Sequence, residues 1–403
     1  MLTEKVRALI ASVAAVVITV GIARFAYTPM IPEMMSGAGL SNTVAGLLAT
    51  ANYAGYLSGA LMISFMRSPL LKLGLYRLGL LGAVLTTGLM GCTEQEWAWY
   101  LLRFLSGLCS ATGVLIGAGL LMTWLLRQGH TPELGVFFSG LGIGIVLTAV
   151  LAELIRAKLN WDRQWIVYAV AACVLLIPVA RWSPNYRDAL PTGTAAAGDG
   201  SGRGGAFMLL LQLSYFCAGV GYVVTATFLV AIAETSALLA GKGWMIWLVT
   251  GCAAAPACWL WDRLVRRQGD WRALLQAYVL NALSVLLLLY MDGLAGVMLS
   301  AVIYGASFIG IVSMTLSMVG RLYPENPSKP MGRLTFGYGI AQVLAPMTVG
   351  YLAELDGHYE SGLWMTLLVI SVGTLLLVGA WYLQRRQRAV RVPEVLHSCV
   401  PGD

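Results

Sequence analysis

The chain has 403 residues, of which 58% are hydrophobic and only 11% are charged, and its mean hydropathy is +0.76. Soluble domains carry about 25% charged residues, so this composition excludes an ordinary soluble protein and indicates a membrane protein. The net charge of +7 does not indicate a nucleic-acid partner, because the basic residues follow a membrane-topology pattern.

Hydrophobic segments long enough to cross a bilayer recur along the whole chain. A spanning helix needs about 20 mostly apolar residues to cross a hydrocarbon core of about 30 Å. The sequence therefore predicts an all-α membrane protein with twelve transmembrane helices, over residues 8–34, 43–66, 74–92, 97–123, 134–155, 161–180, 207–233, 243–261, 271–291, 294–318, 333–355 and 361–383. The first apolar run is too long for a cleaved signal peptide and further spans follow it, so we expect it to be retained.

The first span carries an arginine at a depth where lipid is expected. Arg24 lies 17 residues beyond Arg7, about 25 Å along a helix. A central arginine costs about 2.5 to 3.5 kcal/mol in insertion scales, and such residues usually face a cavity or a partner. We expect Arg24 to line a binding cavity. The alternatives are snorkelling to the outer interface or a structural ion pair with Glu33 or Glu153.

The residues after Arg24 add donors and a possible bend to the same helix. Tyr27 and Thr28 follow at i+3 and i+4, which places them on the same helical face. Pro29 and Pro32 lack an N–H, so each leaves a carbonyl four residues earlier without its helical donor and permits a bend. This pattern predicts a gate in the outer third of the helix, with a tolerated proline kink as an equal alternative.

A second arginine lies in the fourth span, and the acidic residues lie at span ends. Arg103 comes seven residues after Glu96, about 10 Å in from the predicted outer surface. It would contact substrate or serve helix packing, and both interpretations stay open. Glu33 and Glu153, at predicted outer ends, are candidate coupling residues that would titrate as partners of Arg24, with ordinary interfacial carboxylates as the alternative.

The stretch from Ser183 to Gly205 is long, polar and rich in glycine, which predicts a flexible linker. It divides the chain into four regions. They are an N-terminal six-helix bundle (1–182), a cytoplasmic linker (183–206), a C-terminal six-helix bundle (207–384) and a basic cytoplasmic tail (385–403).

The two bundles show weak internal similarity at an offset of 198 residues. Gly21 matches Gly219, and Arg24 matches Tyr222. Polar and aromatic side chains in three spans of the second half are candidate substrate contacts. They are Tyr222, Thr225, Tyr304, Tyr338 and Gln342. Most aromatic residues in transmembrane helices serve packing or the interfacial belts. Those that face inward would form a neutral, hydroxylated wall opposite the arginines.

The basic residues predict the orientation. Of the 26 lysines and arginines, only Arg156, Lys158, Arg163 and Lys242 fall in the loops that are outside when the N-terminus is cytoplasmic. The positive-inside rule therefore places both termini in the cytoplasm. The seven cysteines have no CxxC spacing, and the three histidines lie in loops or the tail, so we expect no disulfide, metal, cofactor or catalytic site.

Three short motifs accompany this layout. "WDRLVRR", Trp261 to Arg267, follows the eighth span; "RFLSGLCSA", Arg103 to Ala111, lies in the fourth; and "GLGIG", Gly140 to Gly144, lies in the fifth. With two parallel six-helix repeats and a cytoplasmic linker, they resemble the major facilitator superfamily. The first motif is similar to its charged cytoplasmic loop, which makes Asp262 and Arg263 gating candidates. The first-half counterpart, "MRSPLLKLGLYR", lacks the aspartate.

The first two spans carry a narrower resemblance. "GIARFAYTPMIPEM" and "GLSNTVAGLLATANYAGYLSGAL" are similar to the bacterial YbfB/YjiJ-type subfamily of that superfamily. The resemblance implies a monomeric secondary transporter of the bacterial inner membrane that works by alternating access. In the superfamily, the first and fourth helices line the central cavity, so Arg24 and Arg103 would share one anionic ligand.

These observations favour transport of a small organic anion with an apolar body, because a neutral or cationic substrate would leave two buried cations unpaired. Proton coupling is an expectation from the superfamily alone. Efflux of amphipathic drugs or metabolites is the alternative function, favoured by the many aromatic residues. A non-transporting sensor or an intramembrane enzyme is a further alternative, but it calls for a signalling domain or buried catalytic residues, and neither is visible in the sequence.

Overall fold

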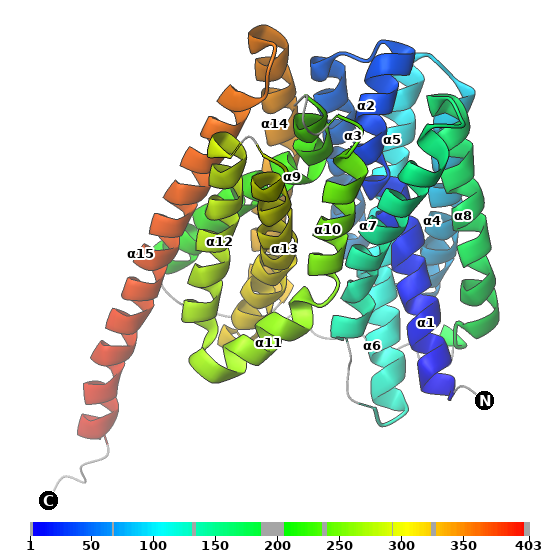
Figure 1. Cartoon of the computed structure of the whole chain (residues 1–403). Coiled ribbons are helices and arrows are strands. Elements are labelled where there is room, and N and C mark those ends of the chain that lie inside the picture. The colour runs from blue at the N-terminus through cyan, green and yellow to red at the C-terminus, as the bar shows by residue number, and fades with distance from the viewer. Residues whose placement is uncertain are drawn as a thin grey trace, which may run out of the picture.

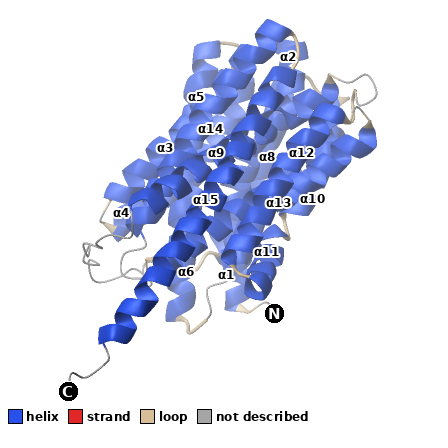
Figure 2. Ribbon diagram, turned by 90° about the vertical axis from the view of Figure 1, so that its left-hand side faces the viewer, coloured by secondary structure: helices blue, strands red, loops and turns tan. Residues whose placement is uncertain are grey.

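The computed structural model describes residues 3–66, 68–130, 134–186, 205–235, 240–291, 293–323 and 328–398. Within these ranges every regular element is a helix (Figures 1 and 2). Most of the predicted linker, residues 187–204, lies outside the described residues, as does the end of the predicted tail, residues 399–403.

The first half of the chain folds into six helical spans, three of which are built from consecutive pieces. The elements are α1 (Glu4–Val16), η1 (Val17–Phe25), α2 (Tyr27–Ala38), α3 (Asn42–Phe65), α4 (Pro69–Leu89), η2 (Met90–Cys92), α5 (Glu96–Ala111), η3 (Thr112–Ile116), α6 (Gly117–Arg127), α7 (Leu134–Arg156) and α8 (Trp161–Trp182). The segments η1 and η3 are π-helical, with a wider backbone than an α-helix. Such segments are frequent at functional sites.

The second half repeats this arrangement. Its elements are α9 (Gly205–Glu234), α10 (Gly243–Ala254), α11 (Ala257–Gln268), α12 (Asp270–Tyr290), α13 (Leu294–Leu322), α14 (Ser328–Asp356) and α15 (Glu360–Ser398). The axes of α10 and α11 differ by 42°. Pro256 lies between them as the N-cap of α11, and its missing N–H explains why the helix breaks there.

Each of the twelve predicted spans lies, to within one residue, inside one helix or one run of consecutive helices. Among the described residues, nine of these helices are long and apolar enough to cross a membrane, and ten when the bent pair α10 and α11 counts as one span. The other two, α3 and α14, are less apolar and pack against each other along the boundary between the halves. That boundary is where polar side chains find partners other than lipid.

The predicted repeat recurs in the packing. Gly107 on α5 lies so close to α3 that a methyl group added to it would meet the backbone carbonyl of Asn52. Gly305 on α13 has the same relation to the carbonyl of Thr250 on α10. Both residues of the second pair stand at the 198-residue offset from the first pair. Because only glycine allows two helix backbones to approach this closely, the repeats share one packing device.

The two halves are joined by hydrogen bonds at one end of the molecule. Figure 1 shows α2, the start of α3 and the end of α14 at that end, whereas the N-terminus, α11 and the end of α15 lie at the other. The bonds at this sealed end run from Thr28 to the Ala226 carbonyl (2.6 Å), from the Thr43 N–H to Glu354 (3.2 Å) and from Tyr359 to Asn42 (2.6 Å). The Tyr359 hydroxyl donates the last of these bonds to Asn42 Oδ1, and burial raises the pKa of this hydroxyl further above neutral pH.

Candidate functional site

Arg24 lies in η1 with its guanidinium between two tyrosine rings. The side chain is only 8% exposed, and its Cζ atom is 4.7 Å from the centre of the Tyr53 ring and 4.4 Å from that of Tyr56. Nε donates a hydrogen bond to Asn52 Oδ1 at 3.2 Å. Within the described residues Nη2 is buried and has no hydrogen-bond partner. The charge is therefore held by aromatic faces and one amide, with Nη2 unsatisfied among the described residues.

The predicted acidic partners of Arg24 make other contacts. Glu33 accepts a hydrogen bond from Gln164 Nε2 at 3.2 Å, and Glu153 forms an ion pair with Arg156 at 2.8 Å. In the part of the chain that the structure describes, neither carboxylate forms an ion pair with Arg24. The structural ion pair considered above is therefore not seen in this conformation.

Asn52 on α3 connects the two helices that carry the arginines. Its Oδ1 accepts from Arg24, and its Nδ2 donates to the Arg103 carbonyl at 3.0 Å and to Ser106 Oγ at 3.3 Å. The residue is fully buried. One amide thus uses both ends of its side chain, so its orientation is fixed by the network.

We expect Asn52→Ala to lower the free energy of unfolding by about 2–4 kcal/mol, because it removes the acceptor of the buried Arg24 Nε and the amide that donates to the Arg103 carbonyl and to Ser106 Oγ. Asn281→Ala is the matched control. Asn281 is equally buried, but it donates one bond of 3.3 Å to Ser307, and its Oδ1 has no partner among the described residues. Denaturant unfolding of the two variants in detergent measures the difference, and equal losses would contradict the special role of Asn52.

Arg103 binds backbone carbonyls around η1. Its Nη1 donates to the Ala23 carbonyl at 3.1 Å and its Nε to the Leu48 carbonyl at 3.4 Å. Its Cζ atom lies 4.3 Å from the centre of the Tyr27 ring, and Tyr27 in turn donates to the Ala45 carbonyl at 2.9 Å. At 2% exposure, Arg103 has the contacts of a residue that holds helices together.

Two carbonyls of η1 accept hydrogen bonds from polar side chains on α5. The Ala23 carbonyl also accepts from Ser106 at 2.7 Å, and the Thr19 carbonyl accepts from Ser110 at 2.5 Å. In a π-helix each carbonyl accepts from the N–H five residues on, and its second lone pair can accept from side-chain donors as well. Arg103, Ser106 and Ser110, spaced i, i+3 and i+7 on α5, supply them.

An aromatic stack in the second half faces the Arg24 site. Tyr222 on α9 stacks on Phe308 with ring centres 5.3 Å apart and on Tyr338 at 5.9 Å. Tyr304 donates to the Tyr222 carbonyl at 2.8 Å. Across the boundary, Tyr53 and Tyr222 meet in a T-shaped arrangement with ring centres 6.3 Å apart. Since Tyr53 also contacts Arg24, the cationic face of the first half and the aromatic face of the second meet here.

The other predicted site residues lie as follows. Thr225 and Gln342 are buried, and the Thr225 hydroxyl and Gln342 Oε1 have no hydrogen-bond partner among the described residues. The π-helical segment η1 ends at Phe25. Pro29 has no N–H to donate to the Phe25 carbonyl. Pro32 lies inside the regular helix α2. Two predicted gating residues, Asp262 and Arg263, are exposed on α11.

Thr28 contacts its own counterpart in the repeat. It donates to the carbonyl of Ala226, and the two positions are 198 residues apart, which is the repeat offset. Equivalent positions in two repeats can touch only near the axis that relates them. Thr28 is one helical turn from Arg24, so the charge lies close to this axis.

Three residues of the site were missed by the sequence reasoning: Asn52, Tyr53 and Tyr56. Their signal was present, because an asparagine and two tyrosines at i, i+1 and i+4 give α3 a polar face in the middle of an apolar span. What the sequence does not give is the rotation of α3 about its axis. That rotation decides whether this face meets lipid, another helix or Arg24.

Comparisons with known proteins agree with this architecture. The family model described as "Uncharacterised MFS-type transporter YbfB" matches residues 16–380. No curated protein matches the sequence. A crystal structure of the nucleoside transporter NupG superposes with a TM-score of 0.72 and 12% identity, covering 94% of this chain and 99% of NupG. That of a point mutant of NupG gives a TM-score of 0.73, again at 12% identity, and covers 94% of this chain and all of the mutant chain. The predicted fold, two six-helix bundles of the major facilitator type, is thereby confirmed.

Proposed function

The chain belongs to the MFS-type transporter family YbfB, and from this premise we propose that its substrate is a small organic anion held by Arg24. The family is one of transporters and not of enzymes, so the chemistry of the site is recognition. In this proposal the substrate binds between the halves and is released on the other side when they rock.

The observation that carries the proposal is the buried, incompletely bonded guanidinium of Arg24. Its Nη2 has no partner within the described residues, and no carboxylate there pairs with it. A buried charge without a counterion is costly, although the rings of Tyr53 and Tyr56 offset part of that cost. A substrate carboxylate would complete both the charge balance and the hydrogen bonding.

The aromatic stack supports a substrate that also has an apolar body. Tyr222, Phe308 and Tyr338 present stacked rings next to the cationic face, and rings favour flat or apolar groups. The same rings would suit an amphipathic metabolite, so efflux of such molecules is the second candidate function. A neutral amphipath, however, leaves the Arg24 guanidinium uncompensated.

Arg103 has a different role in this proposal from Arg24. Its Nε and Nη1 already donate to carbonyls, so we assign it to positioning η1, and through η1 Arg24. Among the second-half candidates, Thr225 and Gln342 have unused polar atoms and remain candidate contacts for polar groups of the substrate.

Alternating access is the mechanism that we propose, with the sealed end of this structure as the closed side of one of its states. The hydrogen bonds at the sealed end join the halves directly above Arg24, through Thr28. With both termini in the cytoplasm, as the basic residues predict, the sealed end faces outward, and the substrate would reach Arg24 from the cytoplasmic side. We propose the bacterial inner membrane as the location.

Proton coupling stays a prediction. Glu33 and Glu153 have local partners in this state, so coupling through either would require it to approach Arg24 in another state. Uptake by liposomes with and without an inward pH gradient tests this. Equal rates would contradict coupling.

The experiment that tests the function is counterflow in liposomes that contain the purified full-length protein. A panel of monocarboxylic acids with aliphatic and aromatic bodies is compared with neutral nucleosides and with hydrophobic cations. We expect exchange of at least one acid and none of the cations. Exchange of nucleosides or cations without any acid would contradict the anion proposal and favour the amphipath alternative.

A further inference from the structure

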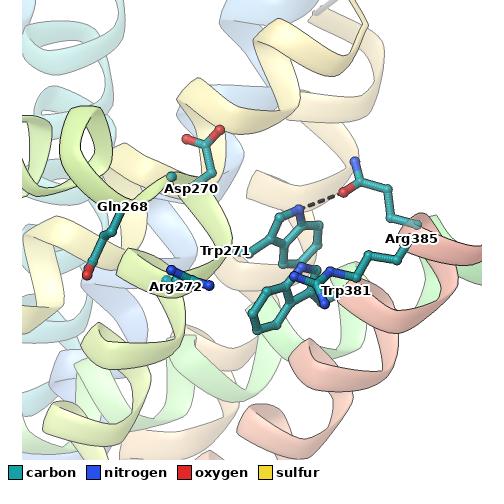
Figure 3. A pocket seen from close by; sticks show the side chains of 8 residues that line it. Gln268, Asp270, Trp271, Arg272, Trp381 and Arg385 are labelled. Atoms are coloured by element: carbon teal, nitrogen blue, oxygen red, sulfur yellow. Dashed lines mark hydrogen bonds between the residues drawn. The ribbon is translucent and has the colours of Figure 1, made fainter. Parts of the chain in front are cut away.

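A cavity of about 280 Å³ lies in the second half, away from the Arg24 site. It is formed where α12 begins, next to the C-terminal part of α15, at the end of the molecule that holds the N-terminus (Figures 1 and 3). Its lining includes Asp270, Trp271 and Arg272 from α12 and Trp381, Gln384 and Arg385 from α15. None of these residues takes part in the contacts of the substrate site.

Two tryptophans give the cavity a rigid aromatic wall. Trp271 and Trp381 stack with ring centres 6.3 Å apart and planes only 3° from parallel. The Trp271 Nε1–H donates to Gln384 Oε1 at 2.6 Å (Figure 3), and Phe207 packs in a T-shaped arrangement against Trp271 with ring centres 6.2 Å apart. Tryptophan with a bonded N–H is typical of the boundary between lipid and water.

The charges around the cavity are net positive. Arg385 lies with its Cζ atom 4.6 Å from the centre of the Trp381 ring, and Arg272 lines the cavity from α12. The carboxylate of Asp270 is paired with Arg321, so it does not neutralise either of them. Two guanidinium groups on different helices thus have donors available for an anion that enters between them.

Exposed apolar side chains continue from each arginine toward the middle of the membrane. On α12, Val279 and Leu283 follow Arg272 at i+7 and i+11 and are 51% and 37% exposed. On α15, Val378 and Leu375 precede Arg385 by seven and ten residues and are 43% and 72% exposed. These spacings place each pair on the same helical face as its arginine. A ligand with an anionic head and long apolar tails fits both features.

We propose that this cavity binds the phosphate of an anionic phospholipid headgroup, with the acyl chains lying along α12 and α15. A free phosphate ion has the same charged group as the headgroup, but it has no apolar part that would contact the exposed apolar faces of α12 and α15. The phosphate would accept from Arg272 and Arg385, and the two tryptophans would flank the glycerol region. This site is independent of the substrate and of the proposed transport of anions.

Native mass spectrometry of the full-length protein in mild detergent tests the proposal, with phosphatidylglycerol and phosphatidylcholine of identical acyl chains as probes. We expect the wild type to retain phosphatidylglycerol at least about tenfold better. The double variant Arg272→Gln with Arg385→Gln should lose that preference. The matched control, Arg266→Gln with Arg267→Gln, removes the same charge from α11 outside the cavity and should keep it.

Three results would overturn the assignment. The first is equal retention of both lipids by the wild type, and this result does not depend on whether any variant folds. The second is a loss of preference in the control as large as that in the cavity variant. The third is displacement of phosphatidylglycerol by millimolar inorganic phosphate, which would make the cavity a site for the free ion.

Discussion

Arg24→Ala is expected to lower the rate of anion counterflow by at least about 30-fold. Removing one member of a buried, hydrogen-bonded charge pair costs about 2–5 kcal/mol, and in the bound state Arg24 would be the substrate's counterion. The loss should appear for every acid that the wild type exchanges, because the variant removes the shared carboxylate contact. Counterflow in liposomes, normalised to the amount of inserted protein, measures it.

Arg24→Lys separates charge from geometry. Lysine keeps the positive charge but loses the planar fork and the Nε–H that bonds to Asn52 Oδ1. We expect an intermediate loss of about tenfold. Arg77→Ala is the matched control, since it removes the same group from an exposed position on α4 and should leave exchange unchanged. Normal exchange by both Arg24 variants would remove Arg24 from the site.

The second large effect is expected from a glycine at the sealed end. A side chain at Gly46 on α3 would run into the Pro346 carbonyl and approach the Cα atom of Gly350 to within 3.1 Å. Backbone atoms on α14 cannot move aside as a flexible side chain can, and overpacking typically costs about 1–3 kcal/mol. Gly46→Val should therefore disfavour the sealed state and slow exchange by about tenfold.

Accessibility shows whether the halves have separated. Thr50 lies on the same contact and donates to the Val343 carbonyl at 2.8 Å, so a cysteine placed there in a chain freed of its native cysteines reports on the seal. We expect a membrane-impermeant maleimide to label it faster when Gly46 is valine. Gly119→Val on α6, where a methyl group meets nothing within 4 Å, is the control. Unchanged labelling and exchange in Gly46→Val would contradict the seal.

The spans of this protein could be read from its sequence because lipid imposes one requirement on every segment. Each helix must satisfy its own backbone and be apolar for about 20 residues, so hydropathy located most of the spans, and only α3 and α14, which pack against each other between the halves, are less apolar. The repeat was visible for a related reason. Close contacts between helices require glycine, and both halves have a glycine at the equivalent position, Gly107 and Gly305. Arg24 stood out because its cost in lipid is high wherever the helix points.

The pairing of side chains could not be predicted in the same way. The sequence pattern placed Tyr27 beside Arg24, since i+3 neighbours share a face of an α-helix. In the structure Tyr27 lies against Arg103, because π-helical η1 ends at Phe25 and a new α-helix begins at Tyr27. A π-helical segment rotates all the side chains that follow it about the helix axis. No residue type in the sequence predicts where such a segment occurs.

The π-helical segment η1 also has a consequence for the order in which the protein is made. Its Ala23 and Thr19 carbonyls bond to Ser106 and Ser110, which follow them by 83 and 91 residues. On a ribosome these partners do not exist when the first span leaves the exit tunnel. The first span therefore enters the membrane before its side-chain donors Ser106 and Ser110 exist, and its contacts are complete only after the fourth span has been synthesised.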